Sequence, residues 1–294
     1  MRDLMTTREV ADYLRLKERK VYDLVKTRRI PCTRITGKWL FPRAMIDLWV
    51  LRNTESGEQT IRPDIPPVIG GSHDPLLEWA IRESGSELAV LFDGSLDGVR
   101  RVIDHQVRAS GMHVIDNDSG TYNRHLIDHN LADGEAVLLQ WAWREQGLIT
   151  APGNPLQLHC VADLARPGVR VIDRQQSAGS HLLLRYLLQQ ADIRPDTLDR
   201  VTQPARNERD AALAVADGVA DAALGIAAVA HQYRLDFVAL HAERYDLLLH
   251  RRDFFEPPLQ ALFEFARTPA FADKAHALGG YDITDLGRVV YNAP

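Results

Sequence analysis

Cysteine and long apolar segments are both scarce in this sequence. The two cysteines among 294 residues, Cys32 and Cys160, are far apart, which excludes a disulfide framework and any Cys-x-x-Cys metal site. No uncharged apolar run approaches the ~18 residues that a membrane span requires. The first residues, MRDLMTTREVADYL, contain no apolar signal core, so we expect a cytoplasmic protein with no membrane partner.

Motifs that bind nucleotides or support nucleophilic catalysis are also missing. The sequence has no Walker loop, no G-x-S-x-G elbow and no dinucleotide fingerprint after a strand. His125 and His129 have the i, i+4 spacing of helical metal ligands, but a solvated helix face explains them as well. We therefore expect no catalytic centre, no metal and no cofactor.

Charge is divided unequally along the chain. Residues 1–52 contain thirteen Lys and Arg against six Asp and Glu, a net charge of +7. The remaining residues contain 22 basic and 34 acidic side chains, a net charge of −12. A basic head on an acidic body indicates that one part of the chain meets a polyanion and the other does not.

The head has the pattern of a winged helix-turn-helix. Thr6 followed by Glu9 predicts a helix start with a capping box, and a second amphipathic helix is predicted over residues 17–27. Two short strands around Gly37 predict a wing. Pro42 is predicted to open a third helix, whose Met45, Ile46 and Trp49 pack back on the first two.

Residues 6–50 resemble the excisionase-type winged helix-turn-helix, related to the DNA-binding heads of MerR-type regulators. The resemblance implies that the helix over residues 17–27 enters a major groove of double-stranded DNA while the wing touches the adjacent backbone. Basic side chains of this segment would neutralise phosphates or contact guanine edges. Tyr22 and Trp39 could each contact DNA or pack between wing and helix. The candidate DNA-binding residues are Lys17, Arg19, Lys20, Tyr22, Lys26, Arg28, Arg29, Arg34 and Lys38.

Three segments follow one another: the DNA-binding head over residues 1–52, a linker over residues 53–68 and a body over residues 69–294. The linker contains Pro63, Pro66 and Pro67 and has little apolar periodicity, which is typical of an exposed hinge. One head covers only a few base pairs, so we expect a homodimer that pairs two heads on a symmetric site.

The body alternates strand and helix, which predicts an α/β fold with parallel sheets covered by helices. Strands are predicted over residues 68–69, 88–92, 112–115, 136–141, 148–150, 169–172, 222–226 and 237–240. Helices are predicted over residues 75–83, 95–106, 182–190 and 208–217, with another between the last two strands. The last ~40 residues, rich in Phe, are predicted to form helices that either complete the body or dimerise.

Three strand-to-helix turns are rich in Gly and Ser: residues 71–72, 94–95 and 177–180. Each would place free backbone N–H groups and a hydroxyl at a helix N-terminus, an arrangement that suits an anion. The alternative is that these residues only cap helices and turn the chain.

The body resembles the periplasmic-binding-protein superfamily domain found behind helix-turn-helix heads in bacterial regulators. The segments that carry the likeness include GGSHDPLL, LFDGSLDGV, YNRHL, VIDRQQSAGSHLLLRYLL and ERYDLLLHR. The resemblance implies two α/β lobes with a ligand between them, and its members are similar to solute-binding proteins for molybdate and tungstate. It implies a cleft lined by Ser72, Ser95, Tyr122, Asn123, Arg174, Ser177, Gly179, Ser180, His181 and Tyr245.

The turn over residues 173–181 departs from the family pattern NRQ-x-GSGTR. Ala178 replaces a serine, Ser180 replaces a threonine and His181 replaces the closing arginine, so one hydroxyl and one fixed positive charge are lost. His181 could make binding pH-dependent.

These patterns predict a one-component transcriptional regulator, not an enzyme, that binds DNA and senses a small ligand, an oxyanion such as molybdate or tungstate. The alternative is a cofactor-biosynthesis enzyme with an accessory DNA-binding head; a recombination accessory protein fits the large body less well.

Overall fold

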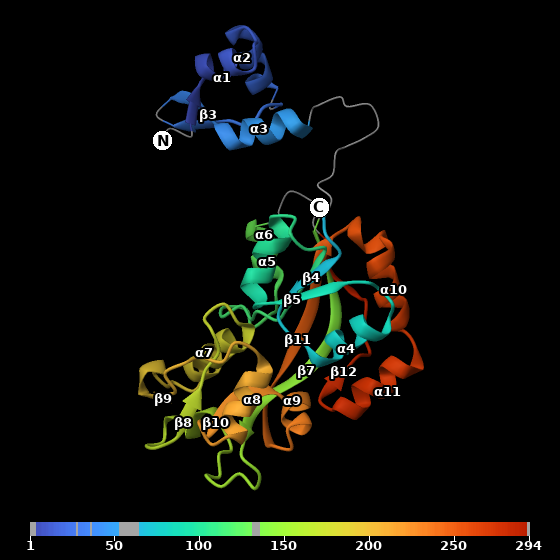
Figure 1. Cartoon of the computed structure of the whole chain (residues 1–294). Helices are drawn as coiled ribbons and strands as arrows, with labels where there is room; N and C mark the ends of the chain where they lie inside the picture. The colour runs from blue at the N-terminus through green and yellow to red at the C-terminus, as the bar shows by residue number, and fades with distance from the viewer. Residues whose placement is uncertain (1–3, 28, 36, 53–64, 131–135, 293–294) are drawn as a thin grey trace. The chain divides into compact units, whose positions relative to one another are not determined.

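The computed structural model describes residues 4–27, 29–35, 37–52, 65–130 and 136–292. The chain divides into two compact units, residues 1–62 and residues 63–294, which we call the head and the body and describe separately (Figure 1). The predicted linker falls largely on residues 53–64, which lie outside the described residues. Within the described residues, no helix has the length and apolar character needed to cross a membrane.

The head combines three helices with a small antiparallel sheet in the order β1-β3-β2, counted over its described residues. The elements are β1 (Leu4–Thr6), α1 (Thr7–Tyr13), α2 (Glu18–Lys26), β2 (Thr33–Ile35), β3 (Lys38–Pro42) and α3 (Arg43–Arg52). The predicted helices and wing are confirmed, and β1 adds a strand that the sequence analysis missed. Three residues are too short for periodicity to reveal a strand.

Local capping and apolar burial together explain the head. The Thr6 hydroxyl accepts the Glu9 amide while the Glu9 carboxylate accepts the Thr6 amide, which is the predicted capping box. The core contains Val10, Ala11, Val21, Val25, Phe41 and Ile46. Met45 was expected to pack inward but is 44% exposed. Pro42 ends β3 instead of opening α3, and Ile46 and Trp49 form the core-facing side of that helix, which leaves the neighbouring Met45 toward solvent.

The body is built on one sheet, ten-stranded over the described residues, in the order β5-β4-β6-β11-β7-β10-β8-β9, with β12 and β13 also paired to β7. The strands are β4 (Val68–Gly71), β5 (Ala89–Phe92), β6 (Ala109–Met112), β7 (Ala136–Thr150), β8 (Arg170–Ile172), β9 (Asp199–Arg200), β10 (Ala222–Ile226), β11 (Asp236–His250), β12 (Tyr281–Asp282) and β13 (Val289–Asn292).

Two lobes share this sheet. Parallel strands β5-β4-β6 form the first lobe with the start of β7 and the end of β11, and parallel strands β10-β8-β9 form the second with the remainder of β7 and β11. Each of the two long strands has 15 residues and runs from one lobe into the other (Figure 1). They pair antiparallel, with register shifts between Ala239 and His241 and between Tyr245 and Asp246.

The prediction was wrong about these long strands. Residues 136–141 and 148–150 were predicted as separate strands, and the last strand was predicted to stop at residue 240. The polar residues Arg144, Glu145 and Gln146 interrupt the apolar pattern, but β7 continues through them because two of their side chains are buried in a polar network. The parallel arrangement holds for the outer strands and fails for β7 and β11.

Helices cover both faces of each lobe. The first lobe carries α4 (Pro75–Glu83), α5 (Ser95–Ile103), α6 (Arg124–Asn130), α10 (Pro257–Phe265) and α11 (Pro269–Leu278); the second carries α7 (Gly179–Gln190), α8 (Glu208–Ala216) and α9 (Ala227–Gln232). Along β7, Leu139 and Leu138 enter cores on opposite faces of the first lobe, and Ile149 and Leu148 do so in the second. Phe263 and Phe271 join the first-lobe core, so the C-terminal helices complete the body.

Candidate functional site

The exposed face of α2 carries a stripe of side chains suited to a nucleic acid. Val21 and Val25 are buried in the head core. Arg19, Tyr22 and Lys26 follow the i, i+3, i+7 spacing on the opposite face, and all three are exposed. Because the head core fixes this helix, the stripe presents two cations and one aromatic ring to solvent as a rigid unit.

The wing supplies more cations beside this helix. Strands β2 and β3 turn at Gly37, whose φ of +83° is a backbone conformation that favours glycine. The Arg34 guanidinium lies 5.3 Å from the centre of the Trp39 ring, and Trp39 packs against the head core. The exposed candidate DNA-binding residues are Lys17, Arg19, Lys20, Tyr22, Lys26, Arg29, Arg34 and Lys38. Arg28 lies outside the described residues.

In the body, the three Gly/Ser-rich turns converge on His113, which follows β6: two meet its ring and one meets its backbone amide. The Ser72 hydroxyl lies 2.9 Å from His113 Nε2, and the His113 amide donates to the Ser95 hydroxyl at 3.4 Å. The third turn approaches from the second lobe, where a Cβ added to Gly179 would lie 2.7 Å from the His113 ring. The three corners therefore face one point between the lobes, where a histidine stands.

His113 belongs to a buried network of charges between the lobes. Its Nδ1 lies 2.7 Å from a Glu243 carboxylate oxygen, and Glu243 also accepts from Arg144 and from Gln146. Arg144 donates to Asp74 at 3.0 Å, and its guanidinium stacks 4.3 Å from the centre of the Tyr245 ring. Ion pairs therefore join the middle of β7 to the middle of β11, where both strands pass between the lobes.

Electrostatics fixes the protonation of this network. Burial raises the pKa of Glu243, but the charge of Arg144 and then His113 outweigh it and lower that pKa to about 2. An ionised carboxylate can only accept, so His113 Nδ1 carries a proton toward Glu243. Hydrogen bonds therefore link Ser72, His113 and Glu243 in that order.

Two helix N-termini meet across the lobes beside this network. The Leu96 backbone amide in the first turn of α5 donates to the Ser177 carbonyl at 3.3 Å, and the Gln175 side-chain amide Nε2 donates to the Asp93 carbonyl at 3.2 Å. Ser177 lies two residues before the start of α7, next to the N-cap residue Ala178. The positive ends of two helices, one from each lobe, thus point toward the same interface.

Several predicted ligand residues have partners within their own lobe. Asn123 donates to Asp246 and accepts from the Val114 amide, which ties the end of β6 to β11. Arg174 pairs with Glu208 at 2.6 Å, and Ser180 donates to the same carboxylate. His181 bonds Asp173 at 3.0 Å. These four side chains shape the turns, and they do not converge on His113.

The two predicted tyrosines also have defined roles. Tyr245 is fully buried and donates its hydroxyl to the Ser72 carbonyl. The Tyr122 hydroxyl lies 2.8 Å from His241 Nε2. Tyr245 therefore fixes the Ser72 corner, whereas Tyr122 packs farther along β11.

Sequence reasoning missed His113, Arg144 and Glu243. His113 follows a third parallel strand, and the carboxyl ends of parallel strands are where ligands bind in α/β sheets. The sequence predicted this strand over residues 112–115, with His113 inside it, whereas β6 ends at Met112, so the misplaced strand hid this position. Arg144 and Glu243 lie inside strands that were predicted to be interrupted or shorter, so nothing indicated that they would meet.

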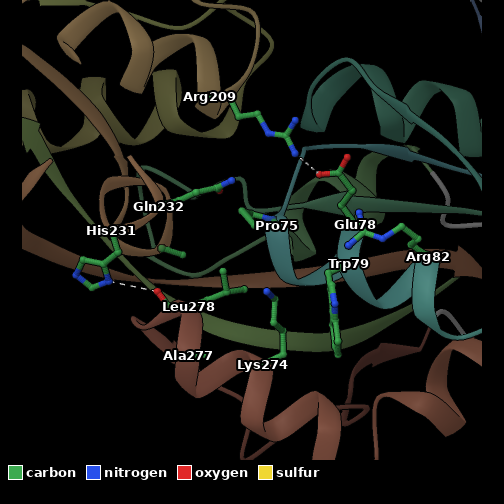
Figure 2. Close-up of a pocket in the computed structure, with 11 residues that line it drawn as sticks. Pro75, Glu78, Trp79, Arg82, Arg209, His231, Gln232, Lys274, Ala277 and Leu278 are labelled. Carbon is green, nitrogen blue, oxygen red and sulfur yellow. Dashed lines mark hydrogen bonds and ion pairs between the residues drawn. The ribbon is translucent and has the colours of Figure 1, made fainter. Parts of the chain in front are cut away.

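A separate pocket of about 330 Å³ lies between α4 and α11 of the first lobe and α8 and α9 of the second (Figure 2). Glu78 accepts from Arg209 at 2.8 Å across the lobes and from His73 at 3.0 Å. Trp79 and Lys274 lie side by side at one wall, with the Lys274 ammonium 5.6 Å from the ring centre. The lining residues are Pro75, Glu78, Trp79, Arg82, Arg209, Ala228, His231, Gln232, Lys274, Ala277 and Leu278.

The possible metal ligands His125 and His129 do not belong to a larger group of ligands in the part of the chain that the structure describes. His125 lies 4.0 Å from Asp116, and the side chain of His129 falls outside the described residues. Among described residues, no group of three or more His, Cys, Asp or Glu side chains could hold a metal ion.

Comparison with known proteins identifies both units. Residues 78–267 match the model of the PBP superfamily domain. The chain belongs to this family. Residues 4–54 match the model of a helix-turn-helix domain. The uncharacterized protein YvgK of Bacillus subtilis is 26% identical over 97% of each chain.

Solved structures share the fold of the body at low identity. The sulfate-binding protein SubI of Mycobacterium tuberculosis aligns with a TM-score of 0.51 at 17% identity over 73% of this chain and 85% of its own. A putative phosphate transporter substrate-binding protein from Clostridium perfringens gives 0.56 at 9% identity over 72% and 96%. The tungstate ABC transporter from Geobacter sulfurreducens gives 0.50 at 14% identity over 70% and 95%.

The PBP-like chain therefore joins a DNA-binding type of domain to a ligand-binding type of domain. This domain organisation suggests a DNA-binding regulator with a ligand-binding domain. Both predicted resemblances are confirmed, and so is the predicted α/β class of the body with its winged head.

Proposed function

We propose that this protein is a homodimeric one-component transcriptional regulator. Its head binds double-stranded DNA, and its body binds a small oxyanion, such as molybdate or tungstate, between the two lobes. The observation that carries the ligand half is the convergence of the Ser72, Ser95 and Gly179 turns from both lobes on one point. Pairing two heads on a symmetric site would raise affinity above that of one head.

The DNA half rests on the exposed cations of α2 and the wing. Arg19 and Lys26 lie on one helix face, and Lys20 is exposed beside them. Each cation that neutralises a phosphate releases counterions, so affinity falls steeply with salt. Fluorescence anisotropy at several salt concentrations measures the affinity of the full chain for a mixed-sequence 20-base-pair DNA duplex.

Variants of the head make this measurement decisive. Lys20→Ala and Arg19→Ala are each expected to lower the slope of log affinity against log salt by about 0.9. Arg288→Ala, in the body and paired with Asp285, is the matched control and is expected to leave the slope unchanged. Equal slopes in all four proteins would mean that α2 does not contact DNA. Sedimentation of the free protein tests the dimer.

The proposed oxyanion site rests on hydrogen-bond donors that lie between the two lobes. The first turns of α5 and α7 lack intrahelical acceptors for their amides, and both helices direct their positive ends at the interface. Arg144 Nε is a buried donor without a partner among the described residues, so the network keeps one N–H for an oxyanion, whereas the unpaired Gln146 Oε1 is an acceptor and does not bind one. The structural relatives that bind sulfate, phosphate and tungstate support the same ligand class.

Calorimetric titration of the full chain with molybdate, tungstate, sulfate and phosphate tests this half. Ser72→Ala and Ser95→Ala each remove one hydroxyl from the converging corners and are expected to weaken binding about tenfold, as loss of a hydrogen bond to a charged group does. Ser119→Ala, on an exposed turn, is the matched control. Heat from none of the four anions would end the oxyanion assignment and leave the DNA assignment intact.

Regulation requires the two sites to be coupled. If the anion changes DNA affinity by some factor, DNA must change anion affinity by the same factor. Repeating the anisotropy titration with saturating anion gives this factor directly. A factor of one would describe a DNA-binding protein whose body ligand has no regulatory effect.

One observation favours a second candidate, an enzyme of the acyl-transfer class. Ser72, His113 and Glu243 are hydrogen-bonded in the order that activates a serine nucleophile. Against it, all three side chains are buried, which keeps substrate from the hydroxyl in this arrangement. Reaction of the full chain with a fluorophosphonate, followed by peptide mass spectrometry, separates the two: an adduct on Ser72 favours the enzyme, and its absence favours the regulator.

A further inference from the structure

The pocket beside α4 is chemically distinct from the converging serine corners. None of Ser72, Ser95, Ser177 or His113 lines it. Its volume of about 330 Å³ falls within the range of small-molecule sites in proteins. Both lobes contribute walls, because α4 and α11 belong to the first lobe whereas α8 and α9 belong to the second.

The pocket contains more positive than negative side chains. Arg82, Arg209 and Lys274 line it, and Glu78 is its one lining carboxylate. Arg82 is partly neutralised at the rim by Glu83 at 3.2 Å, and Arg209 by Glu78 at 2.8 Å. In the described part of the chain, Lys274 has no carboxylate within ion-pair distance, so its ammonium is available to an anion.

The sequence adds weight to this lysine. Of the 22 basic residues in positions 53–294, 21 are arginine and one is Lys274. A lysine is a compact point charge that directs three donors at a single group. Its half-buried position beside an aromatic ring places that charge at the wall of the pocket instead of in bulk solvent.

The remaining lining combines apolar side chains with His231 and Gln232. The Trp79 ring packs against Phe265 at 5.3 Å, which holds its orientation. Leu278, Ala228 and Ala277 line the pocket with small or branched apolar groups. His231 bonds the Leu278 carbonyl at 3.2 Å and thereby links α9 to the end of α11 (Figure 2). A planar ring would find stacking area here, and its charged substituent would find a cation.

We propose that this pocket is a second ligand site, for a small aromatic carboxylate. The ring stacks against Trp79, and the carboxylate accepts from Lys274 and Arg209. Since Lys274 is in the first lobe and Arg209 in the second, the ligand ties the lobes together and competes with Glu78 for Arg209. The site is independent of the oxyanion proposed above.

The test uses 4-fluorobenzoate as the probe and ¹⁹F line broadening as the readout, on the full chain. Wild-type protein is expected to broaden the probe signal in a saturable manner. Lys274→Gln and Arg209→Gln are each expected to weaken binding at least fivefold, and Arg288→Gln, outside the pocket, is expected to change it less than twofold. Uncharged 4-fluorobenzyl alcohol is expected to bind at least tenfold more weakly.

Three results would overturn the proposal: no saturable broadening with wild-type protein, unchanged affinity in the Lys274→Gln, Arg209→Gln double variant, or equal binding of the alcohol. Circular dichroism confirms that each variant is folded. Saturating molybdate is expected to leave the 4-fluorobenzoate titration detectable, and a protein that binds no oxyanion at all still leaves this test intact.

The link between lobes has its own readout. The Leu96 amide donates to the Ser177 carbonyl across the lobes, so its hydrogen exchange reports closure. Peptides that contain Leu96 are expected to exchange several-fold more slowly with 4-fluorobenzoate bound. Exchange that is unchanged at saturation would show that the ligand does not bridge the lobes.

Discussion

Basic side chains have opposite environments in the head and in the body. In the described part of the head, Arg19, Lys20 and Lys26 are exposed and make no ion pair. In the body, Arg144 is 2% exposed and lies between Asp74 and Glu243, and Arg174 is nearly as buried beside Glu208. An unpaired cation at the surface is available to a polyanion, whereas a buried pair holds strands and turns in register.

The contrast shows what residue type alone fails to tell. Arg19 was predicted to contact DNA, and Arg174 was expected in the ligand cleft because of the family resemblance. The structure separates them by burial and partner: Arg174 is satisfied by Glu208 and by the Ala205 carbonyl, and Arg19 faces solvent. Each prediction below strengthens or breaks this division, beginning with the largest expected effect.

Arg144→Met removes the cation between two buried carboxylates. Asp74 and Glu243 would then remain inside the body without their counterion, at a cost of about 3–5 kcal/mol in the free energy of unfolding. Urea unfolding of the full chain, followed in the body transition, measures this loss. Arg100→Met, on an exposed pair with Asp97, serves as control and is expected to lose less than about 1 kcal/mol. Equal losses would erase the distinction between buried and exposed pairs.

Asp246→Asn tests a buried charge by its pH dependence. Burial raises the pKa of Asp246 to about 6, against the opposing effects of Arg244 and Asn123, from an ordinary value of 3.8. The folded state therefore holds this proton more tightly than the unfolded state, and that stabilisation is complete below about pH 3.8. This stabilisation is lost as the pH rises from 3.8 through 6, which lowers the free energy of unfolding by at most about 3 kcal/mol.

The measurement compares wild type and Asp246→Asn by urea unfolding at pH 4 and pH 7. Groups other than Asp246 contribute equally to both proteins, so the difference between their pH dependences isolates this carboxyl. The wild type is expected to lose more stability than the variant over this range. Identical pH dependences would mean that Asp246 titrates at its ordinary pKa in the fold.

Gly179→Ala tests whether the lobes close on His113. The added methyl would lie 2.7 Å from the His113 ring, so the closed arrangement should lose about 1–3 kcal/mol through overpacking. Faster hydrogen exchange in the peptide containing Leu96 is the expected result, with a peptide from α1 as the internal reference. An unchanged exchange rate in the Leu96 peptide would contradict close contact between Gly179 and His113.

Thr6→Ala probes the head by itself. Loss of the Thr6 hydroxyl is expected to destabilise the head by about 1 kcal/mol, because the Glu9 amide at the start of α1 loses its acceptor. Thermal unfolding of the head transition measures the effect. Thr284→Ala, in the body, is the control and should leave this transition in place; a head as stable as the wild type would mean that water replaces the box without loss.

How much the sequence could predict differs between these regions for a physical reason. The head is governed by local signals: the Thr6 cap, the apolar spacing of Val10 to Val25 and the turn at Gly37 were sufficient to predict its elements. The body site is assembled from residues far apart in the sequence. The Ser72 and Ser95 corners followed from turn chemistry, but Glu243 lies 130 positions from His113, and only strand register brings them together.

The shared strands β7 and β11 have a final consequence for engineering. Residues 136–150 and 236–250 each serve both lobes, so no single cut of the polypeptide yields one lobe with a complete sheet. The head, by contrast, ends before either strand begins. Chimeric genes that exchange the first 62 codons should therefore transfer DNA specificity intact, whereas a chimera joined between residues 151 and 235 would take the two crossing strands from different parents.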